Sequence, residues 1–216
     1  MSEQTLNQNP AQAPRLLLAS ASPGRRRVLT DAGIRFDTQV SSVDEDSVLA
    51  AAEAQHGPQD AAATALLLAK AKAEDVAAQA PAGTLVLGCD SVFEIDGVAY
   101  GKPHTADVAR QRWQQLRGSA GVLHSGHWLI AAGGGRSVGL GSATVVHFAQ
   151  VGDAEIEAYV ASGEPLPCAG AFTIDGLASA FIESIEGNYQ SVVGLDVSML
   201  RRLLAEHGVA ITELWA

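Results

Sequence analysis

Short apolar runs of strand length alternate along this chain with longer segments whose composition and end signals are helical. Residues 15–20 (RLLLAS) and 84–89 (TLVLGC) are typical of buried strands. Between them, Ser22 and Pro23 have the pattern of a helix N-cap followed by proline at the first helical position. Two Ala-rich helical segments then lie on either side of residues 56–58. This alternation predicts an α/β fold.

Hairpin signals make the predicted sheet mixed rather than all parallel. Asp96 and Gly97 form a two-residue turn signal between apolar stretches. The three glycines at 133–135 join two further strand-like runs, residues 123–132 and 138–149, and we expect a hairpin loop there because no helix follows them. Further helices are expected at residues 104–117, 153–162 and 196–207, and shorter strands at 35–40, 171–174, 181–185 and 211–215.

Composition excludes several classes of protein. Lys and Arg number 14 and Asp and Glu number 24, so the net charge is −10, which disfavours general binding to nucleic acid or anionic lipid. No apolar run approaches the ~20 residues of a membrane helix. The two cysteines, Cys89 and Cys168, suit a reducing compartment, so we expect a cytoplasmic protein. Residues 1–14 lack signal-peptide features and are expected to be a disordered tail, followed by a single domain over residues 15–216.

The junction after the first predicted strand combines hydroxyls with three consecutive arginines. Ser20, Ser22 and Arg25 lie here, and residues 25–27 place positive charge in the first helical turn, where the helix dipole disfavours it. A bound anion resolves this conflict, because helix N-termini bearing arginine and hydroxyl groups hold phosphate well. The alternative is an exposed basic turn that solvent screens.

A carboxylate follows the apolar strand that ends at Cys89. If Asp96 and Gly97 form the turn, Ser91 faces Lys102 across the hairpin, with Asp90 next to it. A carboxylate at such a strand end can bind Mg²⁺ or accept a proton from water, while a lysine holds phosphate. The alternative is an ordinary cross-strand ion pair.

Three further groups of residues are weaker candidates. The acidic residues 44–46, which include Glu45, suit a hard cation but equally suit helix capping. Lys70 and Lys72 lie on an Ala- and Leu-rich helix, where either one can point into a cleft or into solvent. His124 and His127 have HxxH spacing without an evident third ligand, which favours a structural role.

Taken in order, these segments resemble the Maf family of nucleoside triphosphate pyrophosphatases over residues 16–204. Any one motif is weak, but the ordered set is specific. The matching segments are LASASPGR at 18–25, VDE at 43–45, LAKAKA at 68–73, GCDS at 88–91, GKP at 101–103, AGAF at 169–172 and GNYQSVVGL at 187–195.

The resemblance implies a mixed twisted sheet with flanking helices, in two lobes around a central cleft. It implies hydrolysis of nucleoside triphosphates, standard or modified, to a monophosphate and pyrophosphate, and it suggests a homodimer. Glu45 and Asp90 would surround a divalent cation, Mg²⁺ or Mn²⁺, with Asp90 as the proton acceptor. The register of the lysine motif selects Lys72 over Lys70. The residues that would hold the triphosphate are Ser20, Ser22, Arg25, Lys72, Ser91 and Lys102.

The chain departs from the family pattern at several positions. Gly24 precedes Arg25 where many relatives have two adjacent arginines, and Asp175 stands where many have glutamine. Cys168 and Ser191 replace the usual lysine and asparagine of the late motifs. These differences leave the pyrophosphatase centre intact. They leave open which nucleotide base the resemblance implies.

The residues leave two alternatives to a pyrophosphatase. A nucleotidyltransferase also uses a loop after the first strand with arginine and a later metal-binding aspartate, but its loop is usually richer in glycine than residues 20–25. A non-catalytic nucleotide-binding regulator, for instance of cell division, needs the cationic residues but no acidic base. The presence of Glu45, Asp90 and Lys102 together favours catalysis.

Overall fold

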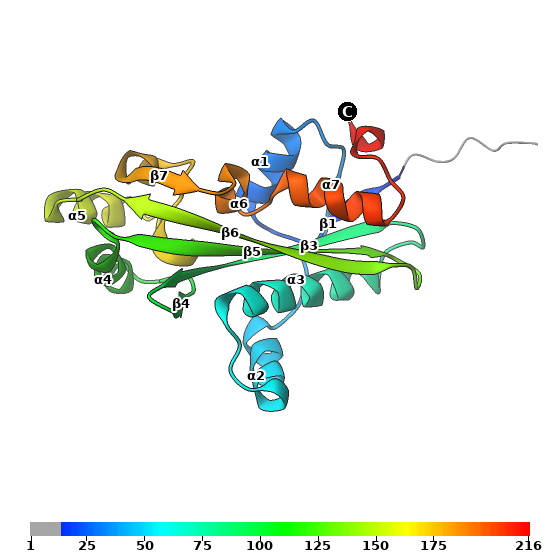
Figure 1. The fold of residues 1–216 in the computed structure, drawn as a ribbon, viewed down its shortest axis with the longest axis horizontal. Helices are drawn as coiled ribbons and strands as arrows, with labels where there is room; N and C mark the ends of the chain where they lie inside the picture. Colours follow the sequence, from blue (N-terminus) through cyan, green and yellow to red (C-terminus); the bar gives the residue numbers. More distant parts are fainter. Residues whose placement is uncertain (1–13) are drawn as a thin grey trace, which may run out of the picture.

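The computed structural model describes residues 14–216, which fold around one seven-stranded mixed sheet (Figure 1). The strand order is β2-β1-β3-β5-β6-β7, with β4 paired to β3 outside this path. Pairing with β1 is parallel, and the other pairs are antiparallel, as the predicted mixed sheet requires. The strands are β1 (Leu16–Leu18), β2 (Asp37–Thr38), β3 (Leu85–Ile95), β4 (Val98–Tyr100), β5 (Ala120–Ala131), β6 (Ser137–Phe148) and β7 (Ile182–Glu186).

Helices cover both faces and one end of the sheet. In Figure 1, α3 crosses below the long strands, α1 and α7 lie above them, and α4 and α5 pack at one end. The helices are α1 (Pro23–Asp31), α2 (Glu45–His56), α3 (Ala61–Ala77), α4 (Ala106–Leu116), α5 (Asp153–Ala161), α6 (Tyr189–Val193) and α7 (Val197–Glu206). None of the helices in the described part of the chain has the length and apolar character of a membrane span. The predicted tail, residues 1–14, lies outside the described residues except for Pro14.

The two edges of β3 are paired differently. One edge pairs with β5 continuously from Leu85 to Glu94. The other edge pairs with β1 at residues 85–87 and with β4 at residues 93–95. Between these two partners, residues 88–92 of β3 have no strand beside them in the described chain. We call this stretch the β3 gap.

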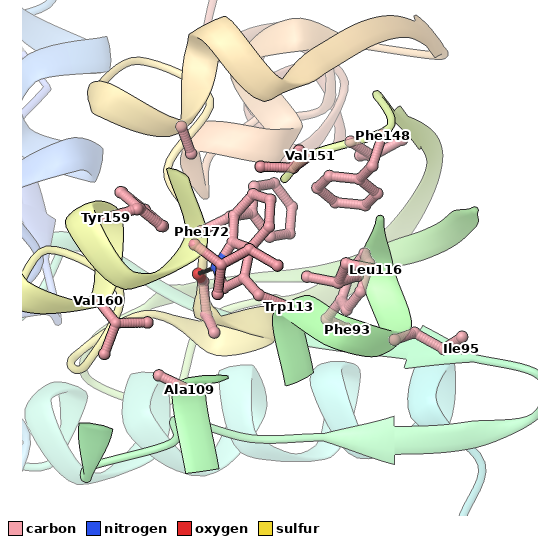
Figure 2. Close-up of a cluster of buried hydrophobic side chains, with 14 of the residues drawn as sticks. Phe93, Ile95, Ala109, Trp113, Leu116, Phe148, Val151, Tyr159, Val160 and Phe172 are labelled. Atoms are coloured by element: carbon pink, nitrogen blue, oxygen red, sulfur yellow. Dashed lines mark hydrogen bonds between the residues drawn. The ribbon is translucent and has the colours of Figure 1, made fainter. Parts of the chain in front are cut away.

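The buried side chains form a different cluster on each side of the β3 gap. The aliphatic cluster joins β1, α1 and α7 to the first half of β3 through leucine and valine side chains. The aromatic cluster lies at the other end of β3 (Figure 2), where Phe93 meets the Phe172 ring edge-on at 5.1 Å and Trp113 meets the Phe148 ring at 5.8 Å. The arrangement in two lobes stays a prediction, because a third, smaller cluster also lies in the described core.

Two glycines let α3 lie directly against the sheet. A Cβ on Gly88 would lie 2.1 Å from the carbonyl oxygen of Ala69, and one on Gly126 would lie 2.3 Å from that of Ala65. Gly88 lies on β3 and Gly126 on β5, so both strands touch the same helix. Any larger residue would push α3 away from the β3 gap.

Two predicted strands are wrong. Residues 171–174 contain no strand, because Ala169–Ala171 form a 3₁₀ turn and Glu164 then accepts backbone hydrogen bonds from the following loop, including Leu177 N at 2.9 Å. Residues 211–215 begin with a 3₁₀ helix, Ile211–Leu214, and only Trp215 makes an isolated bridge, to Ile34. Short apolar runs carry too little periodicity to separate these forms.

Candidate active site

Asp90 lies in the middle of the β3 gap. Its backbone is held on one side by β5, where it pairs with Gly126, and its side chain points toward α3. The alternation of side chains along β3 places Asp90 and Gly88 on the α3 face, and Cys89 and Ser91 on the opposite face. Asp90 is buried, with 7% of its surface exposed. A carboxylate in such a position needs a cationic or hydrogen-bonding partner.

Lys72 provides that partner and joins Asp90 to a second carboxylate. Its Nζ lies 2.5 Å from Asp90 Oδ1 and 2.7 Å from Glu45 Oε1. Lys72 projects from α3, and Glu45 is the first residue of α2, whose N-cap is Asp44. The structure therefore brings together Glu45, Lys72 and Asp90, which are far apart in the sequence. Between the two candidate lysines of α3, Lys72 contacts Asp90, whereas Lys70 pairs with Glu74.

The two carboxyl groups differ in their proton affinity. Burial raises the pKa of Asp90 and outweighs the opposing effects of Lys72 and Arg25. Nearby cations usually lower the pKa of a carboxyl, but the burial of Asp90 has the larger effect here. For Glu45, partial burial raises the pKa, but the hydrogen bond and charge of Lys72, with help from Lys102, leave the pKa of Glu45 lowered. Asp90 is the better proton acceptor of the two.

Arg25 fills the end of the β3 gap nearest β1. It is buried, and its Nη1 donates to the Cys89 carbonyl at 2.7 Å and to Ser20 Oγ at 3.1 Å. Its Nε donates to the Gly194 carbonyl at 2.9 Å. The Cys89 carbonyl points out of the unpaired edge of β3, so Arg25 replaces a missing strand partner there. A guanidinium has five N–H groups, and this network leaves donor capacity on Nη2, whose one bond is to Ser91 Oγ at 3.4 Å.

The other two arginines of α1 also have acceptors within the protein. Arg26 donates to the Ala21 carbonyl at 3.3 Å, and Arg27 lies 3.2 Å from Asp175 and 3.6 Å from Asp31. These acceptors thus offset part of the positive charge in the first turn of α1. Only Arg25 of the three is directed into the β3 gap.

Ser20 and Ser22 shape the loop that leads into α1. Ser22 is the N-cap, and its Oγ accepts the backbone N–H of Arg25 at 3.4 Å, as the sequence predicts. Ser20 Oγ accepts from the Ser22 backbone at 3.2 Å as well as from the Arg25 side chain. Ser20 Oγ therefore lies beside the guanidinium of Arg25, whereas Ser22 Oγ contacts the Arg25 backbone.

Ser91 belongs to a chain of hydroxyl groups that crosses the sheet. Its Oγ lies 3.0 Å from Ser125 Oγ on β5, and Ser125 donates to the Ser191 carbonyl at 3.0 Å. Because Ser125 has only one proton, Ser91 must donate to Ser125 and can accept from Arg25. The hydroxyl of Ser91 is thus fixed by β5 and α6.

Lys102 does not face Ser91 across the hairpin. The predicted turn is confirmed, since Ile95 pairs with Val98 and Phe93 with Tyr100, but β4 ends at Tyr100 and Ser91 has Ser125 as its strand partner. Lys102 is exposed beyond the end of β4. Its charge still contributes to lowering the pKa of Glu45, so Lys102 belongs to the same electrostatic field.

The two histidines of the HxxH spacing do not act together. His127 is fully buried, accepts the Asp196 backbone N–H at 2.8 Å, and has its pKa lowered to about 4 by burial. His124 lies 3.4 Å from Glu94. The structural interpretation of His127 agrees with these contacts.

Two cavities of the described chain lie away from the cluster around Asp90. One of about 640 Å³ is lined by Arg15, Asp37 and Thr84, at the far ends of β1 and β3. Another of about 220 Å³ lies over β5 and β6, beside His124 and Ser125. The expected central cleft thus remains a prediction for the open face of the β3 gap.

The donor set around Asp90 suits a divalent cation that is shared with phosphate. Within residues 14–216, no group of three or more His, Cys, Asp and Glu side chains is arranged to hold a metal. Glu45 and Asp90 nevertheless face one common cation already, the Lys72 ammonium. Mg²⁺ is commonly bound by one or two carboxylates together with substrate phosphates and water. These two carboxylates fit that pattern.

Two buried polar groups were overlooked in the sequence. The Gly194 carbonyl orients Arg25, and only its place in a late motif could have pointed to it. Arg112 is buried on α4, in line with Ala109, Trp113 and Leu116. That spacing was available from the sequence, because a charged residue at i+3 in an apolar helical stripe is exceptional.

The arrangement as a whole places a buried carboxylate between cationic groups from both sides of the β3 gap. Arg25 lies on the β1 side, Lys72 on the α3 face and Lys102 beyond β4. Such a set can hold a polyanion by charge-assisted hydrogen bonds while one carboxylate accepts a proton.

Comparison with known proteins agrees with this chemistry. Residues 15–207 match the family model described as Maf-like protein. A protein of Leifsonia xyli named nucleoside triphosphate pyrophosphatase is 51% identical, over 93% of this chain and 96% of the relative. Proteins of the same name from Streptomyces coelicolor (49% identical, 96% and 97% covered) and Salinispora tropica (51% identical, 94% and 88% covered) are also similar to it.

Proposed function

The chain belongs to the Maf family, and from this premise we propose that it is a nucleoside triphosphate pyrophosphatase acting at the β3 gap. The observation that carries the proposal is the buried Asp90, which shares the Lys72 ammonium with Glu45. The substrate is a nucleoside triphosphate, and the products are a nucleoside monophosphate and pyrophosphate.

Cations on three sides of the gap bind the triphosphate. Arg25 reaches the phosphates through the donor capacity of Nη2, supported by the hydroxyls of Ser20 and Ser22. Lys102 approaches from the end of β4. Each charge-assisted contact contributes about 1.5–3 kcal/mol. Ser91 holds the guanidinium in place, since its hydroxyl donates to Ser125 and accepts from Arg25.

Asp90 accepts the proton from the attacking water. The water oxygen forms a bond to the α-phosphorus, the bond from that phosphorus to the α,β-bridging oxygen breaks, and pyrophosphate leaves with the bond's electrons. Burial raises the pKa of Asp90, which strengthens it as a base, while Lys72 keeps the ionised form populated. General-base assistance of this type is worth about 10²- to 10⁴-fold.

Glu45 and Asp90 would hold a divalent cation together with the substrate phosphates. Mg²⁺ and Mn²⁺ are the ions that prefer such oxygen ligands. When bound, the ion would neutralise phosphate charge and polarise a phosphoryl oxygen. Lys72, which pairs with both carboxylates, would also hold the triphosphate.

The proposed cytoplasmic location rests on the two cysteines, and the proposed homodimer rests on the family. Cys89 and Cys168 are both free thiols, and burial raises the pKa of each to about 11, so both are protonated at neutral pH. Unpaired thiols agree with a cytoplasmic protein. The homodimer rests on the family resemblance and is tested by the mass of the protein in solution.

Product analysis tests the proposed function most directly. A panel of nucleoside triphosphates, standard and modified, is incubated with the protein and Mg²⁺ or Mn²⁺ in ¹⁸O-labelled water. We expect monophosphate and pyrophosphate, with the label in the monophosphate because water attacks the α-phosphorus. Release of diphosphate and inorganic phosphate would overturn the proposal. Binding without any hydrolysis would favour a regulator.

A further inference from the structure

Arg112 occupies a position on α4 where an aliphatic residue would be expected. Ala109, Trp113 and Leu116 share its buried face and pack in the aromatic cluster, and Arg112 itself is only 8% exposed. None of the proposed steps uses it. A buried guanidinium is costly unless its charge and its donors are compensated.

The compensation of Arg112 is incomplete. Its Nη1 donates to the Gly101 carbonyl at 2.5 Å, and its guanidinium lies 4.8 Å from the centre of the Tyr100 ring. Its buried Nε has no acceptor, and no carboxylate of the described chain forms an ion pair with it. Burial lowers the pKa of Arg112. All of its polar contacts therefore go to the two residues before Lys102.

These contacts matter because the chain around Lys102 has few other hydrogen bonds, although Pro103 is buried. Ladder pairing of β4 ends at Tyr100, Gly101 has no side chain, and Pro103 has no backbone N–H to donate. The next backbone contact to another part of the fold is from His104 to the Leu166 carbonyl at 3.2 Å. Arg112 therefore holds the chain in place between the end of β4 at Tyr100 and the backbone bond of His104.

We propose that Arg112 is a positioning residue for the reaction: it fixes the end of β4 and thereby directs Lys102 toward the triphosphate. This inference rests on the proposed function only for the role of Lys102. It adds a second buried arginine to the site, which acts without touching the substrate.

A double-mutant cycle tests the coupling between Arg112 and Lys102. Arg112→Met retains length and apolar packing but removes the donors and the charge. We expect it to weaken binding of a non-hydrolysable α,β-methylene triphosphate about 3- to 30-fold and to raise KM similarly, with kcat changed less. In a Lys102→Met background, the same change should alter binding by less than about twofold. Equal effects in both backgrounds would overturn the inference.

Matched variants separate positioning from stability. Arg110 lies two residues earlier on α4, is paired with Asp107 and Glu157 on the surface, and Arg110→Met should leave binding unchanged. Arg112→Lys keeps the charge without the planar guanidinium and should rescue binding only in part. If Arg112→Met does not fold, Tyr100→Leu removes the ring on which Arg112 rests and should give the same coupling. A Tyr100→Leu effect that is independent of Lys102 would contradict the proposal.

Binding and turnover are measured separately, so two failures can be told apart. A wild-type protein that binds the analogue without releasing pyrophosphate would refute the proposed function while the cycle still decides on Arg112. A normal turnover with additive effects in the cycle would refute the role of Arg112 alone. A wild-type protein that does not bind the analogue would refute both.

Discussion

The two buried arginines on opposite sides of the β3 gap are held in contrasting ways. Arg25 donates to Gly194, Cys89, Ser20 and Ser91, which come from segments up to 169 residues away. Arg112 has a single carbonyl acceptor, 11 residues away, and one aromatic ring. The first arginine is fixed by the whole fold, whereas the second is fixed by one hairpin and one helix.

This difference indicates how the two halves of the site contribute. The β1 side is organised before substrate arrives, because a buried network determines where Arg25 points. The β4 side carries an exposed lysine on a short strand with few anchors. We expect changes on the β1 side to affect both stability and binding, and changes on the β4 side to affect mainly binding.

The largest effect is expected at Asp90, which lies between the two sides. Asp90→Asn retains size but removes the charge and the capacity to accept a proton, so kcat should fall about 10²- to 10⁴-fold. Binding of the α,β-methylene analogue should be largely retained. Pyrophosphate release and analogue binding are followed in parallel.

Glu94→Gln is the matched control, because Glu94 lies on the same strand and the same face but pairs with His124. It should keep normal turnover. Normal turnover in Asp90→Asn would move the proton acceptor elsewhere, with Glu45 the next candidate.

Arg25→Ala tests whether the β1 side is held by its network. The change leaves the Gly194 and Cys89 carbonyls without their donor, and the free energy of unfolding should fall by about 2–4 kcal/mol. The sequence alone favours the opposite result, since removing a cation from a helix N-terminus relieves the dipole. Denaturant unfolding without ligand decides between them.

Arg26→Ala is the control for the same helix, since Arg26 is exposed and donates only to Ala21. Its effect on stability should stay within about 0.5 kcal/mol. If the two variants were equally stable, the buried network of Arg25 would contribute nothing, and the contrast with Arg112 would disappear.

Gly88→Ala tests the close approach of α3 to the sheet. The added Cβ would overlap the Ala69 carbonyl, so α3 must shift and carry Lys72 away from Asp90. We expect a loss of about 1–3 kcal/mol in stability together with reduced turnover. Gly141→Ala on β6 meets no atom within 4 Å and should be neutral in both measurements. Full activity in Gly88→Ala would separate the helix position from catalysis.

Much of the fold could be predicted because local signals agreed with the final structure. Ser22 caps α1 and Asp96 and Gly97 form the β3–β4 turn, as their sequence patterns indicate. Where a tertiary contact decided the backbone, prediction failed. The loop at residues 173–178 is shaped by the carboxylate of Glu164, which no local pattern reveals.

The residues of the site could likewise be predicted, whereas their contacts could not. The candidates Arg25, Lys72 and Asp90 were found as charged residues in or beside apolar segments, and the structure brings them together. Their partners could not be predicted, because hairpin register suggested Lys102 beside Asp90 and gave no information on α3. The family motif selected Lys72, and the packing of α3 on Gly88 explains how Lys72 reaches Asp90.

The smallest effect is expected in the pH profile of activity, which reports on the ionisation of Asp90. Burial raises the pKa of Asp90, and Lys72 opposes that rise. Because a base must be deprotonated, activity should fall with decreasing pH at a higher pH than for an exposed aspartate. Lys72→Met removes the opposing cation, so the pKa of Asp90 should rise further and the acidic limb of kcat/KM should move to higher pH.

Lys70→Met is the control for this measurement, because Lys70 lies one half-turn earlier on α3 and pairs with Glu74 instead. Both variants act on the same triphosphate, so any pH dependence that they have in common reflects ionisation of the substrate. Only the difference between the two profiles reports on Asp90. A limb that stayed in place or moved to lower pH in Lys72→Met would mean that the titrating group does not respond to the Lys72 charge, and would remove Asp90 from the role of base.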